Sequence, residues 1–224
     1  MIDLTNNGIR EIAGKTFHKV GNVRRLVLDH NDLIISGPQH HPRIFSNFFN
    51  LEQLHLTNAF TETIDSQWYL RDLKNVFSTS NLTKIKKLHL EQNEIWSIND
   101  LDMFCPLVAL EELYLGDNQL QVWQRVNKKL RVNKQLASLI FLQGVEFDIK
   151  CLRNLRHLDL EYNKIRRFPN STLSQFDRVF GSDDADNKQL NLKGNAFRCD
   201  CHLQNFKDWL EETDVQFYHK EEIR

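Results

Sequence analysis

The stretch FCPLVALEELYLGDNQL, Phe104 to Leu120, decides the architecture of the chain. Its apolar residues are spaced by three as far as Leu113 and then by two to Leu115, and Asn118 follows three residues later. A spacing of two is typical of a strand whose alternate residues face a core, whereas a spacing of three does not fit that strand. The stretch therefore predicts a short strand with a coiled or helical approach.

The same spacing recurs along the chain, so this stretch is one unit of a repeat. The pattern L-x-L-x-x-N-x-[LIF], with Ile or Leu at the first position, is matched at residues 2–9, 26–33, 88–95, 113–120, 158–165 and 190–197, and in part at residues 54–61. In this third unit Ala59 replaces the Asn, and Thr61 stands at the last position. One such match would mean little, but seven predict a stack of similar units.

These units resemble the leucine-rich repeat family over nearly the whole chain. The resemblance implies an α/β solenoid with a curved parallel sheet on its concave face and loops and short helices on its convex face. The physical reason is that one unit cannot bury its apolar edge alone, while stacked units share a continuous core.

The repeated Asn residues are expected to form a ladder. The turn after each strand leaves backbone groups that need partners, and a buried Asn amide can both donate and accept hydrogen bonds there. At Ala59 we expect a gap in the ladder, which neighbouring Asn58 would fill only through a local shift.

We expect one elongated solenoid over residues 1–197, with about seven repeats, and a truncated cap over residues 198–224. Residues 121–157 break the rhythm, and Ile140, Leu142, Val145 and Phe147 in this segment indicate one more, degenerate repeat. In the long third unit, the segment DSQWYLRDLKNVF predicts a short convex helix with apolar residues at Trp68, Leu73, Val76 and Phe77.

The end of the solenoid carries the most specific motif, Asn-x-Phe-x-Cys-x-Cys at residues 195–201, followed by an apolar helical face of Leu203, Phe206, Trp209 and Leu210. This motif is similar to the carboxy-terminal cysteine-rich cap (LRRCT) of the Slit, Toll-like and leucine-rich repeat/immunoglobulin groups, although Ala196 stands where the family usually has Pro. The resemblance implies that Cys199 and Cys201 form disulfides with partners beyond Arg224, so that the chain is a fragment.

The other two cysteines, Cys105 and Cys151, are interpreted as buried free thiols, with a mutual bridge as the alternative. The cap motif and the sequons at Asn81 and Asn170 favour a secreted or cell-surface glycoprotein. No signal peptide opens the chain, which leaves a cytosolic location as the alternative.

Composition excludes several classes of function. The net charge of −1 gives no case for nucleic acid, and no apolar run is long enough for a transmembrane helix. No phosphate-binding Gly-rich loop, zinc-protease motif or nucleophile elbow is present, so we expect no enzyme, cofactor or metal. The basic residues Arg125, Lys128, Lys129 and Arg131 are a candidate for glycan contact, although a solvated helix face explains them better.

Residues between and after the inward leucines are expected to line the concave face. The predicted binding residues are Asp29, His55, His89, Glu91, Tyr114, Asp117, Asp159, Glu161 and Tyr162. Their charges would reinforce one another across strands about 4.8 Å apart, and the aromatic residues would anchor a protein ligand or co-receptor. We therefore predict a receptor ectodomain or secreted adhesion, guidance or matrix protein. The alternatives are a cytosolic scaffold that docks regulatory enzymes and a merely solvated sheet face.

Overall fold

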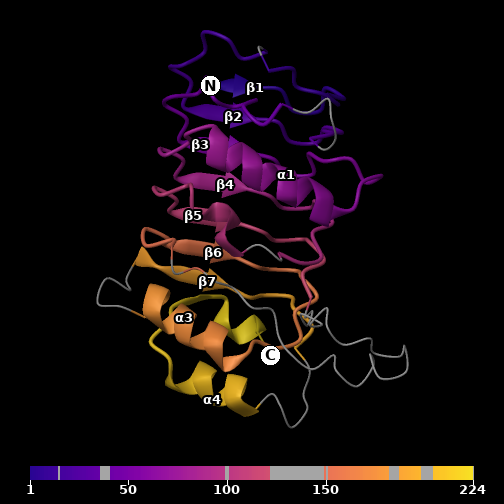
Figure 1. Ribbon diagram of the computed structural model, residues 1–224. Coiled ribbons are helices and arrows are strands. Elements are labelled where there is room, and N and C mark those ends of the chain that lie inside the picture. The colour runs from indigo at the N-terminus through magenta and orange to yellow at the C-terminus, as the bar shows by residue number, and fades with distance from the viewer. Residues whose placement is uncertain are drawn as a thin grey trace, which may run out of the picture.

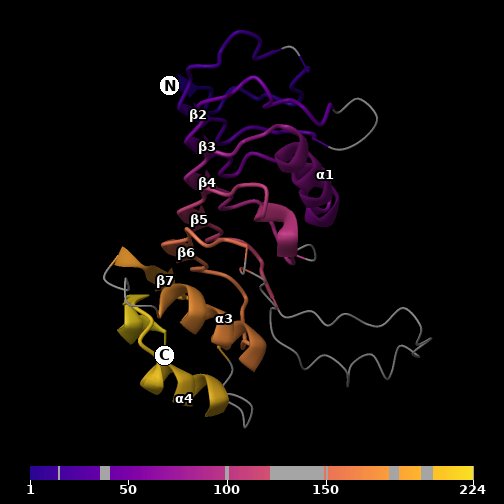
Figure 2. The same ribbon diagram turned by 60° about the vertical axis from the view of Figure 1, so that its left-hand side comes forward.

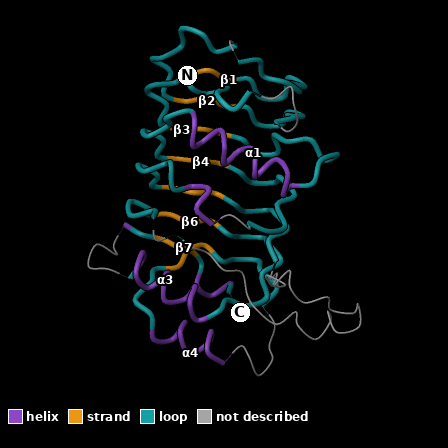
Figure 3. Tube along the Cα trace, in the orientation of Figure 1, coloured by secondary structure: helices purple, strands orange, loops and turns teal. Residues whose placement is uncertain are grey.

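The computed structural model describes residues 1–14, 16–35, 41–98, 101–121, 149, 151–181, 187–197 and 204–223. Its eight strands form one parallel sheet in strict chain order (Figures 1 and 3). The strands are β1 (Ile2–Asp3), β2 (Arg25–Val27), β3 (Gln53–His55), β4 (Lys87–His89), β5 (Glu112–Tyr114), β6 (His157–Asp159), β7 (Gln189–Asn191) and β8 (Phe217–Tyr218). The predicted solenoid of stacked parallel strands is confirmed.

The register of the sheet follows the repeat template residue by residue. The central strands pair Leu54 with Leu88 and Leu88 with Leu113, so the first inward leucines form a continuous column. The second leucines, such as Leu90 and Leu115, are also fully buried. Two leucines per unit thus bury one side of the sheet, and the residues between them face the other side.

Figure 2 shows helices along one side of the upper strands and around the carboxy-terminal end of the sheet. They are α1 (Ser66–Thr79), the 3-10 helix η1 (Leu101–Phe104), α3 (Asn170–Phe180), α4 (Gln204–Glu212) and the 3-10 helix η3 (Lys220–Glu222). None of the helices in the described ranges combines the length and apolarity that a bilayer span requires.

Helix α1 confirms the predicted convex helix, but with a different buried face. Leu73, Val76 and Phe77 are buried as expected, together with Tyr69, whereas Trp68 is 56% exposed and its ring lies against Arg71. An α-helix has 3.6 residues per turn, so position 68 lies on a different face from the stripe of buried residues. Asp65 caps the helix by accepting a hydrogen bond from the Gln67 N–H at 2.9 Å.

The Asn ladder forms, and its gap at Ala59 is closed by the backbone. On either side of the gap, Asn31 and Asn93 donate to the carbonyls of Leu28 and Leu56. At the gap itself, the Leu33 N–H donates to the Ala59 carbonyl at 2.8 Å. Asn58 does not substitute: its side chain lies 3.3 Å from the His30 ring and does not enter the ladder.

Strand β5 pairs directly with β6, with Leu113 opposite Leu158. The two strands are therefore neighbours in the sheet. The residues that indicated a degenerate repeat, Ile140, Leu142, Val145 and Phe147, lie outside the described residues, as does the basic run that begins at Arg125.

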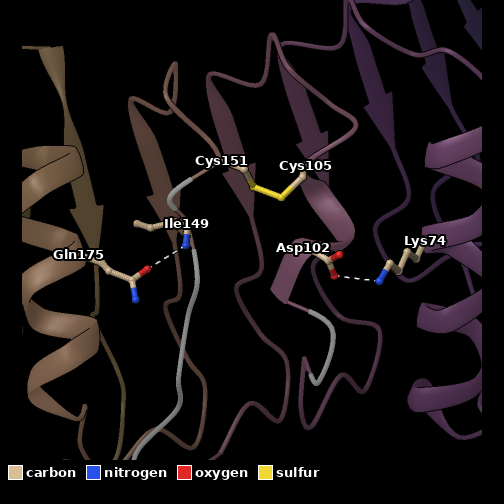
Figure 4. The surroundings of a disulfide bond; sticks show 6 residues. All are labelled: Lys74, Asp102, Cys105, Ile149, Cys151 and Gln175. Atoms are coloured by element: carbon tan, nitrogen blue, oxygen red, sulfur yellow. Dashed lines mark hydrogen bonds and ion pairs between the residues drawn. A yellow bond between two sulfur atoms is a disulfide. The ribbon is translucent and has the colours of Figure 1, made fainter.

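Cys105 and Cys151 form a disulfide, so the favoured prediction of free thiols is wrong. Their Cα atoms are 5.4 Å apart, although 46 residues separate them in sequence. The cause is the direct pairing of β5 with β6, which brings the approach segments of two successive units side by side. Ion pairing of Lys74 with Asp102, on α1 and η1, and a hydrogen bond from the Ile149 N–H to Gln175 of α3 flank the bridge (Figure 4).

The carboxy-terminal end closes the core with aromatic residues. Phe206 of α4 is buried and stacks on Phe197 with ring centroids 4.7 Å apart, while Trp209 donates a hydrogen bond from Nε1 to Asp177 at 2.7 Å. The following strand, β8, pairs with β7, with Phe217 opposite Leu190. This eighth strand was not predicted, because it lacks the leucine and asparagine template. Cys199, Cys201 and Leu203 lie outside the described residues.

Candidate functional site

The concave face consists of three rows of side chains that cross the sheet. The first row precedes the inward leucines: Arg25, Gln53, Lys87, Glu112, His157 and Gln189. The middle row lies between the leucines: Asp3, Val27, His55, His89, Tyr114, Asp159 and Asn191. The third row follows the second leucine: Thr5, Asp29, Thr57, Glu91, Gly116, Glu161 and Lys193.

A stack of rings occupies the centre of the middle row. The rings of His55 and His89 are parallel within 9°, with centroids 4.1 Å apart, and those of His89 and Tyr114 lie within 6° at 4.2 Å. His157, from the first row of the next strand, extends the stack at 5.1 Å. The strand spacing of about 4.8 Å permits this contact, because in-register strands place equivalent side chains at nearly the stacking distance of aromatic rings.

A hydrogen-bond network fixes the acidic groups beside the stack. Glu91 Oε1 lies 2.9 Å from His89 Nδ1, and Glu91 Oε2 accepts a hydrogen bond from the Thr57 hydroxyl. Asp29 Oδ1 accepts a hydrogen bond from the Thr57 N–H at 2.8 Å. Asp29, His89 and Glu91, three of the predicted binding residues, are thus joined in one network on β2 to β4 and the turns after them.

A second acidic group lies further along the sheet. Asp159 is buried and accepts a hydrogen bond from the Glu161 N–H at 2.9 Å, and Glu161 in turn accepts one from Asn191 Nδ2 at 3.0 Å. A Cβ at Gly116 would lie only 3.1 Å from the Glu161 side chain, so the glycine leaves room for this carboxylate.

The remaining two predicted residues, Asp117 and Tyr162, lie at the rim of the face. Both occupy the turn after the strand, with φ of 50° and 48°, a left-handed conformation that costs a side chain some strain. Tyr162 is half exposed, and its ring lies over Gly194, where a Cβ would clash at 2.3 Å. The structure thus places seven of the nine residues on the strands or directly after them and two on the adjoining turns.

Sequence reasoning missed the first row, which makes the opposite edge of the face partly basic. Lys87 forms an ion pair with Glu112 at 2.8 Å, and the Tyr114 hydroxyl donates to the same carboxylate at 2.7 Å. The strand period of two was the available signal, because the residue before the first inward leucine also faces outward. The face is therefore acidic along its third row and mixed in charge along its first row.

Burial and neighbouring charges shift several ionisable groups on this face. Burial lowers the pKa of His55 to about 4, and the nearby His89 and Arg25 add to the effect. Burial also lowers the pKa of His157. Burial, with smaller contributions from the charges of Glu161, Glu91 and Asp117, raises the pKa of Asp159 to about 6, while the hydrogen bond from the Glu161 N–H opposes the rise.

Replacing Asp159 by Asn should stabilise the fold at neutral pH but not in acid. The raised pKa means that the folded state holds this proton more tightly than the unfolded state, so ionised Asp159 costs stability above about pH 6. We expect the variant to gain about 1–2 kcal/mol near pH 7.5 and nothing near pH 4, since the Asn oxygen can still accept from Glu161. Urea unfolding at both pH values measures this; an equal change at both would show that the charge is not responsible.

Both predicted glycosylation sites are exposed and lie away from the strands. Asn81 follows the end of α1, and Asn170 is the first residue of α3. Helix α3 itself was not predicted, although Leu173, Phe176 and Phe180 provide an apolar stripe. Glycans at these two asparagines would leave the concave face open.

Comparison with known proteins adds independent evidence on the family. A family model described as Leucine Rich Repeat matches residues 154–176. The chain has the leucine-rich repeat fold. The crystal structure of human 5T4, the trophoblast glycoprotein, superposes with a TM-score of 0.73 over 99% of this chain and 69% of that one, at 21% identity, which supports the shared fold alone.

Two curated relatives align over most of this chain. Human lumican is 26% identical over 203 residues, which cover 74% of this chain and 59% of lumican. The zebrafish (Danio rerio) protein named transforming growth factor beta activator LRRC33 is 25% identical and covers 99% of this chain. The chain spans less than two thirds of either relative, 59% of lumican and 34% of LRRC33.

The disulfide bears on the predicted compartment. Disulfides persist in oxidising compartments and are rare in the cytosol. The Cys105–Cys151 bond therefore supports the predicted secreted or cell-surface location.

Proposed function

We propose that the chain is the protein-binding module of a cell-surface receptor or a secreted adhesion, guidance or matrix protein, and that its concave face holds the partner. The observation that carries this proposal is the ring stack of His55, His89 and Tyr114, bordered by the fixed carboxylates of Glu91 and Glu161. Stacked rings offer a large, rigid contact area at low entropic cost, and aromatic residues are enriched among the residues that dominate binding energy.

The charge pattern indicates what the partner surface looks like. The third-row acids Asp29, Glu91 and Glu161 would face basic groups of the partner, while Lys87 and Arg25 of the first row would face acidic or polar ones. The solvated-face alternative predicts no such selectivity. It also leaves the ordered hydrogen bonds from Thr57 and Asn191 to these carboxylates without a functional reason.

Charge reversal tests the proposal. The full chain, made as a tetramer to raise its avidity, would first be screened against secreted proteins and receptor ectodomains. A protein that binds it saturably would then be used as the partner. We expect Glu91→Lys, Asp117→Lys and Glu161→Lys together to weaken binding to this partner at least about 100-fold by surface plasmon resonance, because each reversal places like charges in contact.

A matched control separates local from overall charge. Glu11→Lys, Glu211→Lys and Glu212→Lys change the net charge equally, at exposed positions away from the concave rows. This control triple should bind as the wild type does. Equal affinity of the wild type and the concave triple would remove the support for this face as the binding surface.

A further inference from the structure

A pocket of about 470 Å³ lies on the flank of the solenoid, outside the three concave rows. It is formed by the segments that follow β3, β4 and β5 and by the first turn of α1. The lining residues are Asn58, Phe60, Thr61, Glu62, Ile64, Asp65, Ser66, Tyr69, Gln92, Asn93, Glu94, Trp96 and Gln119. This volume falls in the range of about 300–1,000 Å³ that is usual for ligand sites.

Aromatic rings give the pocket rigid walls. Phe60 and Tyr69 stack with centroids 4.4 Å apart and planes within 16°, and the Tyr69 hydroxyl donates to the Asn93 carbonyl. Trp96 is half-buried, and its Nε1 donates to Asp65 at 3.2 Å. These contacts hold both walls in place before any ligand arrives.

The charge of the lining is entirely negative. Glu62, Asp65 and Glu94 are exposed acids, and the lining contains no Lys, Arg or His. Within the described part of the chain, the carboxylates of Glu62 and Glu94 form no ion pair and accept no hydrogen bond. Burial, followed by the charges of Glu94 and Asp65, raises the pKa of Tyr69, which is consistent with a negative potential inside the pocket.

One buried polar group of the lining lacks a partner. Ser66, the first residue of α1, is 3% exposed, and its hydroxyl has no hydrogen-bond partner among the described residues. A ligand that reached this hydroxyl would supply its missing hydrogen bond and gain affinity.

We propose that this flank pocket binds an arginine side chain of a partner protein. A guanidinium group carries five N–H donors in a plane, which suits acceptors spread around a pocket, and its faces stack on aromatic rings such as that of Trp96. A metal ion fits poorly, because it needs convergent ligands. Among the described residues, only His219, Glu221 and Glu222 bring three ligand atoms within 4.8 Å of one another, and they lie elsewhere.

The pocket does not depend on the proposed role of the concave face. None of its lining residues belongs to the three rows, and the acids involved are different ones. A single arginine here would add to the specificity of a partner held on the inner curve, or would act alone. A small probe can therefore test the pocket without knowledge of the partner.

The test uses the peptide acetyl-Gly-Arg-Gly-amide as the probe and nuclear magnetic resonance of the ¹⁵N-labelled full chain as the readout. We expect saturable shifts of the Trp96 indole N–H and of backbone amides around Glu62 and Glu94. The same peptide with citrulline, the uncharged isostere of arginine, should cause no saturable shift. The peptide with lysine should bind several-fold more weakly, since an ammonium group cannot make the same planar set of contacts.

Two variants locate the site. Glu62→Gln with Glu94→Gln should weaken the arginine peptide about tenfold or more, and Ser66→Ala should weaken it several-fold, with unchanged melting temperatures as the check on folding. Glu91→Gln with Glu161→Gln, on the concave face, should have no effect. Equal binding of arginine and citrulline or of arginine and lysine, no binding at all, or loss of binding only in the concave-face variant would each overturn the proposal.

Discussion

Replacing Asn118 by alanine is expected to lower the free energy of unfolding by about 3–5 kcal/mol. Asn118 is 5% exposed and its amide lies in the middle of the ladder. Its Oδ1 accepts hydrogen bonds from the backbone N–H groups of Asn93 and Ile95. Its Nδ2 donates to the backbone carbonyls of Leu90, Leu115 and Gly116. The variant would leave several buried backbone groups without partners, each at a cost of about 1–3 kcal/mol before relaxation.

Chemical unfolding of Asn118→Ala beside Asn7→Ala gives the measurement and its control. Asn7 holds the equivalent position in the first unit, but it is exposed and its amide donates only to the Thr5 carbonyl among the described residues. We expect the control to lose less than about 1 kcal/mol. Equal losses at the two positions would mean that the ladder does not carry the stability assigned to it.

Removal of the Cys105–Cys151 disulfide is expected to cost about 2–4 kcal/mol. The bond closes a loop of 46 residues, so its loss frees a long segment in the unfolded chain. The double variant Cys105→Ala and Cys151→Ala should therefore unfold at a lower temperature than the wild type in calorimetry.

Reduction supplies the control for this comparison. A thiol reductant should bring the wild type down to the melting temperature of the double variant, while the variant itself should shift much less. If the oxidised wild type and the variant melted together, the two cysteines would not be joined in the folded protein.

The periodic parts of the fold were predictable from sequence because every stacked unit must bury the same apolar and Asn side chains. Each strand places two leucines inward, and each turn uses an Asn amide, so matches of one template define the solenoid from Ile2 to Phe197. Ala59 shows the limit of this reasoning. The sequence predicts the gap in the ladder. It does not predict the hydrogen bond from the Leu33 N–H to the Ala59 carbonyl that closes the gap, because this bond depends on the backbone geometry and not on the residue type.

The disulfide was misjudged for a related reason. A separation of 46 residues between Cys105 and Cys151 looks long in sequence, yet both cysteines lie in the approaches to β5 and β6, which are paired neighbours in the sheet. Local pattern reasoning has no access to which units become adjacent. The partners of Cys199 and Cys201 stay a prediction, as do the limits of the cap.

The candidate site was predictable to the extent that it follows the strand period. His55, His89 and Tyr114 occupy equivalent positions, so their presence on one face follows from register alone. Their parallel stacking and the basic edge at Lys87 depend on side-chain rotamers and on the first row, which the template does not include. The flank pocket joins segments from three units with a helix start and has no sequence signature.

Site-specific photocrosslinking shows whether the partner binds the inner curve of the solenoid. Benzoylphenylalanine would replace Tyr114 in the ring stack or, as the control, Trp68, which is exposed on α1 on the opposite side of the sheet. We expect a covalent adduct with the bound partner from position 114 and none from position 68. An adduct from position 68, with none from position 114, would contradict it.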